Sequence, residues 1–295
     1  MWLRRLLYDK ITAGWMLLTL GMIVVLPLTI TIVLYSKSLP LLGNFTIKQL
    51  VLGAEWSPLE GKFGFFSFII NSVYLTLLAF LFSAPVCLLA AIYLTQFASS
   101  RLVRLSQPVI DILAGLPSVI YGVWGIIVIV PFVGEWLAPI FGLSSSGYSV
   151  LAGSIVLAIM CIPYMLNMLI EVFNTVPIGL KEASLSMGAT LWEAIKHVVI
   201  RKSVPGIVSA FGLGMAKALG ETLAVLMVVG NRVQMNFNPF EAGYPLTALI
   251  ANNYGEMLSI PQYDSALMFA ALLLLIIILC INLFFRVLIN RSVKA

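Results

Sequence analysis

The sequence predicts an all-α membrane protein with six transmembrane helices and both termini in the cytosol. Of the 295 residues, 61% are hydrophobic and only 10% are charged, whereas soluble domains carry about 25% charged residues. The apolar residues gather in long runs, so lipid is the solvent for most of the chain. The formal net charge of +5 is explained by basic cytosolic loops and does not suggest binding to nucleic acid.

Six segments are long and apolar enough to cross a bilayer, which takes roughly 20 mainly apolar residues. All six should be helices, because lipid cannot satisfy the backbone polar groups of an open strand. The segments cover residues about 14–36, 67–94, 107–133, 148–171, 204–230 and 263–289.

The first segment has an alternative interpretation as a cleaved signal peptide, because Arg4 and Arg5 precede its apolar run. The run is longer than a usual signal core, and no small-x-small cleavage site closes it. We therefore favour a retained span.

The distribution of lysine and arginine sets the expected orientation. With the N-terminus in the cytosol, the cytosolic segments hold twelve of these residues and the outer segments hold four. The twelve are Arg4, Arg5, Lys10, Arg101, Arg104, Lys181, Lys196, Arg201, Lys202, Arg286, Arg291 and Lys294. The four are Lys37, Lys48, Lys62 and Arg232. Because cytosolic loops carry the excess of positive charge, both termini are expected inside.

The outer loops 37–66 and 231–262 are rich in aromatic and turn residues. Aromatic rings suit the headgroup level of a bilayer, so we expect interfacial anchoring rather than ligand binding by individual residues. As surfaces, these loops are where an extracytoplasmic partner would dock. The three cysteines lack metal-ligand or redox spacing, and no metal or cofactor is expected.

The segment 172–203 is polar and is expected to form short helices at the cytosolic surface. Pro177 suits a helix start, since its missing N–H costs nothing there, and Gly188 suits a turn between two helices. Trp192, Ile195 and the valines that follow recur at helical spacing and predict an apolar face. Periodicity alone also fits an ordinary amphipathic connector resting on the bilayer.

Two ionisable residues, Lys217 and Glu221, fall inside the fifth predicted span. A lysine at a helix centre costs about 2.5–3.5 kcal/mol on insertion scales. The spacing of four would place both side chains on one helix face, where they could pair. One interpretation is a structural ion pair. The other is a polar site beside a permeation path, where the lysine attracts an anionic solute.

The third predicted span carries Asp111 near its cytosolic end and Pro117 farther along. Pro117 removes an intrahelical hydrogen bond and should kink the span. Irregular backbone is tolerated beside a cavity, so Ser118 and Tyr121 are predicted to lie along the path. A plain packing kink is an equal alternative.

The residues of the segment 172–203 resemble a motif of a known family. Glu182-Ala183-Ser184, with Gly188 four residues later, is similar to the EAA motif of ABC-importer permeases. Ser184 replaces the second alanine of that pattern, and Arg201 stands where the family has proline, although Pro205 could stop the helix. The resemblance implies a MetI-like permease fold, in which Glu182, Ala183, Ser184 and Gly188 contact an ATP-hydrolysing subunit.

The resemblance extends to GLPSVIYGVWG at 115–125 and KALGETLAVLMVVGN at 217–231. Both are similar to phosphate-specific ABC-importer permeases, and more to the C-type (PstC-like) subunit than to the A-type. That family usually has arginine where this chain has Lys217. The lysine ammonium is a compact point charge, whereas the planar guanidinium of arginine can bind two oxygens at once.

The resemblance implies an organisation and a set of partners. Residues 1–66 would be an N-terminal span with an outer loop, 67–289 the permease core with coupling helices at about 172–203, and 290–295 a cytosolic tail. The partners would be an A-type permease, two ATP-binding subunits and an extracytoplasmic phosphate-binding protein in a bacterial or archaeal inner membrane.

Other functions remain alternatives at the level of sequence. A permease for molybdate, tungstate or phosphonate fits the same motifs, and a secondary transporter would explain the charges in the membrane but not the EAA segment. The chain has no G-x-x-x-x-G-K-[ST] loop, so ATP hydrolysis is assigned to a partner. An intramembrane enzyme is disfavoured, because the single histidine, His197, lies in the cytosolic segment.

Overall fold

The computed structural model describes residues 2–235, 237–255 and 261–294. Parts of the second outer loop (236 and 256–260) and of the predicted tail (295) therefore lie outside the described residues. The helices are α1 (Trp2–Asn44), α2 (Ile47–Leu52), α3 (Phe66–Gln96), α4 (Ser100–Gly115), α5 (Ser118–Trp124), α6 (Ala138–Ile140), α7 (Val150–Asn174), α8 (Ile178–Ser186), α9 (Leu191–Ala194), α10 (Arg201–Gly220), α11 (Leu223–Val228), α12 (Leu246–Asn253) and α13 (Pro261–Lys294). Shorter elements are β1 (Trp56–Ser57), β2 (Lys62–Phe63), the 3-10 helix η1 (Pro58–Glu60), and the π-helical stretches η2 (Gly125–Ile129), η3 (Phe132–Leu137) and η4 (Ile195–Ile200).

Within the described residues, six helical segments are long and apolar enough to cross a membrane, which confirms the predicted number. They are Asp9–Asn44, Phe66–Gln96, Ser118–Ile140, Val150–Asn174, Leu191–Gly220 and Gln262–Ser292. The third and fifth segments differ from the predicted bounds: the third starts only at Ser118, and the fifth runs from Leu191 to Gly220.

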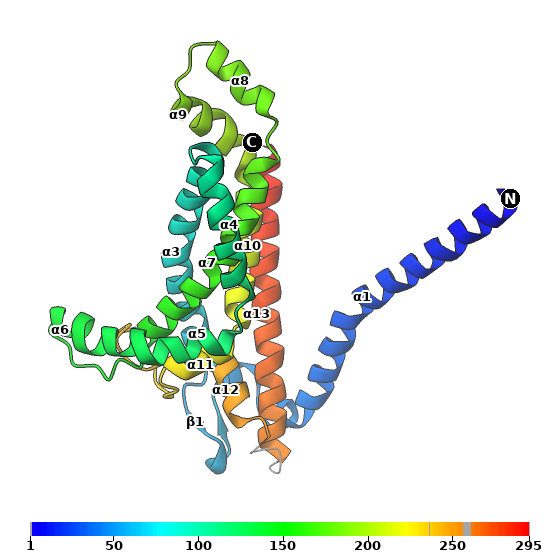
Figure 1. Ribbon diagram of the computed structural model, residues 1–295. Helices are drawn as coiled ribbons and strands as arrows, with labels where there is room; N and C mark the ends of the chain where they lie inside the picture. The colour runs from blue at the N-terminus through cyan, green and yellow to red at the C-terminus, as the bar shows by residue number, and fades with distance from the viewer. Residues whose placement is uncertain (1, 236, 256–260, 295) are drawn as a thin grey trace.

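The core of the protein is a bundle of α3, α4, α7, α10 and α13 (Figure 1). The pair α8 and α9 lies at one end of the bundle, and α12 and the β1–β2 hairpin lie at the other (Figure 1). The continuous stretch from α5 to α6, and α11 beside it, run across the bundle rather than along it (Figure 1). One apolar core joins α3, α7, α10 and α11, and a second joins the hairpin, α12 and α13.

Helix α1 contains the first predicted span and leaves the bundle at the hairpin end (Figure 1). Its C-terminal part packs on α13, with Leu41 and Ser38 fully buried. Residues 9–30 are exposed on all sides. This apolar stretch has lipid, or another chain, as its only suitable surroundings.

The first outer loop corrects one prediction. Phe63 and Phe65 of this loop and Phe68 at the start of α3 are buried, with relative exposures of 5%, 0% and 0%. The Trp56 ring lies 5.8, 5.2 and 5.0 Å from their ring centroids in edge-on contacts, which favour packing beyond simple area burial. These rings form a core under the hairpin instead of anchoring the loop at the interface.

The third predicted span is divided by Pro117. Leu116 ends α4 in an extended conformation, with φ −66° and ψ 133°, and α5 begins at Ser118. Proline disfavours the helical region for the residue that precedes it, so the expected kink is a full break. The amphipathic α4 joins the bundle, and the membrane-length segment starts only at Ser118.

Candidate functional site

The EAA segment forms α8 and the turn after it. Glu182, Ala183 and Gly188 are exposed, whereas Ser184 is half-buried. Gly188 has φ +88°, and its N–H donates to the Leu185 carbonyl at 3.0 Å while the Ala189 N–H donates to the Ser184 carbonyl at 3.3 Å. This pair of bonds is the Schellman motif with glycine at the left-handed position. The predicted turn at Gly188 is confirmed.

The second short helix starts as a helix but does not end where expected. Thr190 and Glu193 form a reciprocal capping box, with the Thr190 N–H donating to Glu193 Oε2 at 2.7 Å. From there the helix runs through η4 into α10 without a stop at Arg201 or Pro205, so the proposed stop is wrong. Trp192 is 53% exposed, so it also lies outside the apolar face that buries Ile195.

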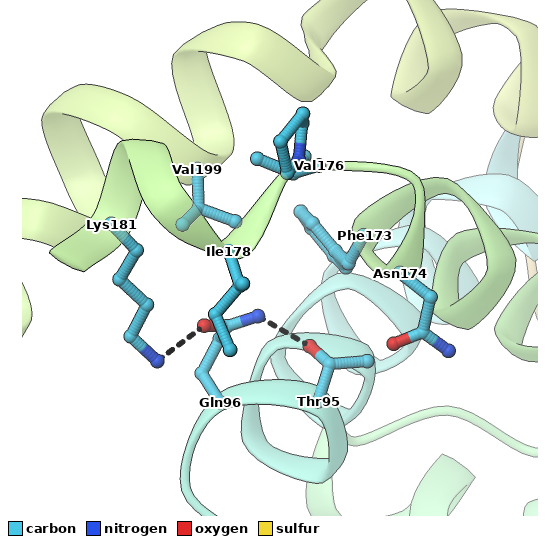
Figure 2. A pocket seen from close by; sticks show the side chains of 9 residues that line it. Thr95, Gln96, Phe173, Asn174, Val176, Ile178, Lys181 and Val199 are labelled. Carbon is cyan, nitrogen blue, oxygen red and sulfur yellow. Dashed lines mark hydrogen bonds between the residues drawn. The ribbon is translucent and has the colours of Figure 1, made fainter.

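The inner side of α8 is tied to the end of α3. Lys181 Nζ donates to Gln96 Oε1 at 2.9 Å, and Gln96 Nε2 donates to Thr95 Oγ1 at 3.3 Å (Figure 2). These side chains border a cavity of about 210 Å³ together with Phe173, Asn174 and Val199. The outward side of α8 is thus left to the EAA residues, and its inward side is fixed to the bundle.

Lys217 and Glu221 do not share a continuous helix, which corrects the predicted pairing. Helix α10 ends at Gly220, and Glu221 has an extended conformation with φ −73° and ψ 131°. In the part of the chain that the structure describes, no ion pair joins the two side chains. The chain turns at Glu221, and α11 continues across the bundle from Leu223 (Figure 1).

Lys217 has an aromatic partner instead of an acidic one. Its Nζ lies 4.3 Å from the centroid of the Tyr164 ring on α7, within the range of a cation–π contact. Lys217 is exposed on the surface of this chain, and Tyr164 is half-buried. The Lys217 ammonium group therefore lies against a neutral ring at the exposed surface of the subunit.

A polar stripe that the sequence analysis missed continues from Tyr164 along α7. Asn167 and Glu171 follow at spacings of three and four, so all three lie on one helix face. Asn167 Nδ2 donates to Asp111 Oδ1 at 3.0 Å, and Gln107 Nε2 donates to Asn167 Oδ1 at 3.0 Å and to Asp111 Oδ1 at 3.2 Å. The sequence signal for this stripe is the Asn167 amide inside an apolar run. Its partner, Asp111, lies 56 residues away in the sequence, so the sequence alone does not connect the two.

Ser118 and Tyr121 have different surroundings. Ser118 is half-buried at the start of α5. Tyr121 is 6% exposed, and its hydroxyl donates to the Leu113 carbonyl at 2.7 Å. The Leu113 carbonyl also accepts from the Leu116 N–H at 3.3 Å, so the Tyr121 hydroxyl adds a second, shorter bond at the end of α4, where Pro117 has no N–H to donate. This bond gives Tyr121 a structural role.

Replacing Tyr121 with phenylalanine separates this structural role from contact with a solute. We expect Tyr121→Phe to lower the stability of the protein by about 1 kcal/mol and to leave transport unchanged, because only one hydrogen bond is lost. Thermal unfolding in detergent and solute uptake would measure the two effects. A large loss of uptake without loss of stability would instead place the hydroxyl on the path.

Residues 83–294 match the family described as Binding-protein-dependent transport system inner membrane component. The chain belongs to this family. It is therefore a permease subunit of the ABC-importer type and a multi-pass protein of the inner membrane. The six helical segments of the described residues that are long and apolar enough to cross a membrane agree with this.

Individual relatives of this permease agree with the family. It is 34% identical over 251 residues to the phosphate transport system permease protein PstC of Xylella fastidiosa, covering 80% of this chain and 77% of that one. It is 36% identical over 231 residues to the probable ABC transporter permease protein YqgH of Bacillus subtilis, covering 77% and 73%.

Solved structures share the fold. A subunit of a bacterial alginate ABC transporter, in complex with an alginate pentasaccharide-bound periplasmic protein, superposes with a TM-score of 0.62 over 98% of both chains at 18% identity. A chain of the inward-facing MetNI methionine ABC transporter superposes with a TM-score of 0.58 over 75% of this permease and 93% of that chain at 22% identity. The predicted MetI-like fold is confirmed.

Proposed function

We propose that this permease imports inorganic phosphate, as one of two membrane subunits that enclose a path and alternate between outward-open and inward-open states. The observation that carries the proposal is its similarity, over 80% of its length, to a protein named as a phosphate transport system permease. Both termini and the α8 end of the bundle lie in the cytosol in this proposal, in keeping with the excess of lysine and arginine there.

The polar face built from α4, α7 and α10 supports the position of the path. It joins Lys217, Tyr164, Asn167, Asp111 and Glu171. In the single chain Lys217, Asp111 and Glu171 are exposed, and Tyr164 and Asn167 are half-buried. Ionisable side chains within a membrane protein face the protein interior or a water-filled cavity rather than lipid. This face is therefore assigned to the second, A-type permease, with the solute passing between the two subunits.

We place the anion at Lys217, the cation among the side chains named on that face, and away from the carboxylates Asp111 and Glu171. Lys217 attracts the solute, while Glu221 at the nearby helix break limits how tightly it is held, and Ser118 contributes a hydroxyl from α5. A lysine forms fewer directed bonds than an arginine would, so the anion is attracted by charge and passed on. Closure of two ATP-binding subunits against Glu182, Ala183, Ser184 and Gly188 moves α8 and drives the change of state, and a phosphate-binding protein delivers the cargo outside.

Reconstitution with the proposed partners tests this function. We expect liposomes that contain the complete complex and the binding protein to take up radiolabelled phosphate only with ATP, and an excess of molybdate or phosphonate to compete poorly. Uptake that follows molybdate or phosphonate instead would identify another oxyanion importer. Uptake by this chain alone, driven by an ion gradient, would replace the proposal with a secondary transporter.

A further inference from the structure

Two cavities adjoin at the α8 end of the bundle, away from Lys217. The first, of about 210 Å³, lies between the end of α3, the end of α7 and the start of α8 (Figure 2). The second, of about 370 Å³, lies between α3, α4 and α7. Both are lined by Thr95 and Asn174. They are therefore two parts of one cleft, which we call the α3–α8 cleft.

The α3–α8 cleft is basic. Lys181 lines its first part and Arg104 its second part. Among the described residues no aspartate or glutamate lines either part, although Gln107 of the second part donates to Asp111 Oδ1 at 3.2 Å. The remaining polar lining consists of hydroxyl and amide groups, among them Thr95, Ser100 and Asn174. A lysine and an arginine among neutral hydrogen-bonding groups can bind a phosphate group through charge-assisted hydrogen bonds.

Both cations keep donors that the protein does not use. Lys181 Nζ donates to Gln96 Oε1 at 2.9 Å, which leaves two of its three protons. Arg104 Nε donates to the Ser100 carbonyl at 3.2 Å. In the described part of the chain, the Arg104 Nη atoms have no hydrogen-bond or ion-pair partner, so the forked end of the guanidinium is available to a ligand.

We propose that the α3–α8 cleft binds a phosphate group, supplied either by an anionic phospholipid headgroup or by free phosphate, at a site distinct from Lys217. The cytosolic position of the cleft rests on the proposed function. Basic pockets between transmembrane helices on the cytosolic side bind anionic headgroups. A ligand here would bridge α4 to α8, and so would bias the movement of the EAA segment relative to the bundle.

Binding to the complete complex in nanodiscs tests the proposal. All proteins carry Lys217→Met, so that the path contributes no cation. In nanodiscs of neutral phosphatidylcholine, radiolabelled phosphate binding is measured, and in a second set, without phosphate, the enrichment of phosphatidylglycerol around the complex is measured. We expect one of the two ligands to bind, and Arg104→Gln with Lys181→Gln to weaken that binding at least about tenfold, since two charge-assisted bonds are lost.

Arg101→Gln is the matched control, because Arg101 lies one turn before Arg104 on α4 and is exposed as Arg104 is, but is not among the described residues that line the two cavities. We expect it to leave binding within about twofold, because an exposed charge outside the cleft adds little. Loss of phosphate binding identifies the free anion as the ligand, and loss of phosphatidylglycerol enrichment identifies the lipid. Equal binding by the double variant and the control, or no binding of either ligand, overturns the proposal.

The proposed function has a separate readout. Phosphate uptake by the complex with Lys217 intact tests the importer, whether or not the α3–α8 cleft binds anything. Co-purification of the partner subunits in normal ratio confirms that the double variant is assembled. A folded, assembled double variant with unchanged ligand binding therefore counts against the cleft alone.

Discussion

Lys217→Met is expected to lower ATP-driven phosphate uptake by about ten- to a hundredfold, the effect of removing one charge-assisted contact with an anion. The variant should assemble normally, because Lys217 is exposed in the single chain and contacts only the ring of Tyr164 among the interactions that the described residues show. Uptake of radiolabelled phosphate into liposomes, normalised to assembled complex, measures the effect.

Three variants serve as controls for this prediction. Lys217→Arg keeps the charge and should retain uptake. Tyr164→Leu removes the cation–π contact, worth about 0.5–1 kcal/mol at an exposed site, and should lower uptake only a few-fold by loosening the ammonium. Lys202→Met removes an exposed lysine at the opposite end of α10 and should change nothing. Normal uptake by an assembled Lys217→Met complex would contradict the site.

The number of spans could be predicted from the sequence because it depends on one quantity, the length of each apolar run against the thickness of the hydrocarbon. The turn at Gly188 could be predicted because its cause is also local, a residue that adopts positive φ between two helical patterns. Neither inference needed to know which helices are neighbours.

The break between α10 and α11 is the opposite case. The residues from Ala218 to Val228 continue the apolar pattern with only Glu221 and Thr222 interrupting it, so periodicity favours one helix. The helix ends at Gly220 because α11 packs across the bundle on α5 and α7, a tertiary contact that local sequence does not contain. The prediction that Lys217 and Glu221 share one helix face was wrong for that reason, because a spacing of four residues places side chains on one face only within a continuous helix.

The polar stripe was out of reach for a related reason. The sequence shows Asp111 as a charge near a helix end. Its place in a polar stripe depends on hydrogen bonds with Gln107 and Asn167, which form because α4 packs on α7. A single sequence gives no pairing between segments 60 residues apart. Side chains that act together on one face of a bundle become visible only once the helices are placed.

Replacing Gly188 is expected to uncouple transport from ATP hydrolysis. Gly188 has φ +88°, and no atom lies within 4 Å of the position that a Cβ would take, so substitution acts through the backbone and not through a clash. Left-handed conformation costs an ordinary residue about 1–2 kcal/mol, which is a factor of about 5–30 in population. Gly188→Ala should therefore lower the amount of phosphate imported per ATP hydrolysed by roughly that factor.

The same helix supplies a matched control. Gly179 lies in α8 with a helical backbone and also has open space where a Cβ would be added. Gly179→Ala should be neutral or slightly stabilising, because alanine is favoured over glycine inside a helix by roughly 0.5–1 kcal/mol. Gly188→Asn should fall between wild type and Gly188→Ala, since asparagine adopts the left-handed region more readily.

The three variants together distinguish a role of the turn geometry at Gly188 from a role of the exposed side chains of α8. If the Schellman turn sets the angle at which α8 meets the ATP-binding subunit, phosphate uptake per ATP should follow the preference of residue 188 for the left-handed conformation. The amount of bound ATP-binding subunit should stay constant across the variants. Equal coupling in Gly188→Ala and Gly179→Ala, with both complexes assembled, would show that the turn is dispensable. The EAA segment would then act through the exposed side chain of Glu182 and not through the geometry that follows it.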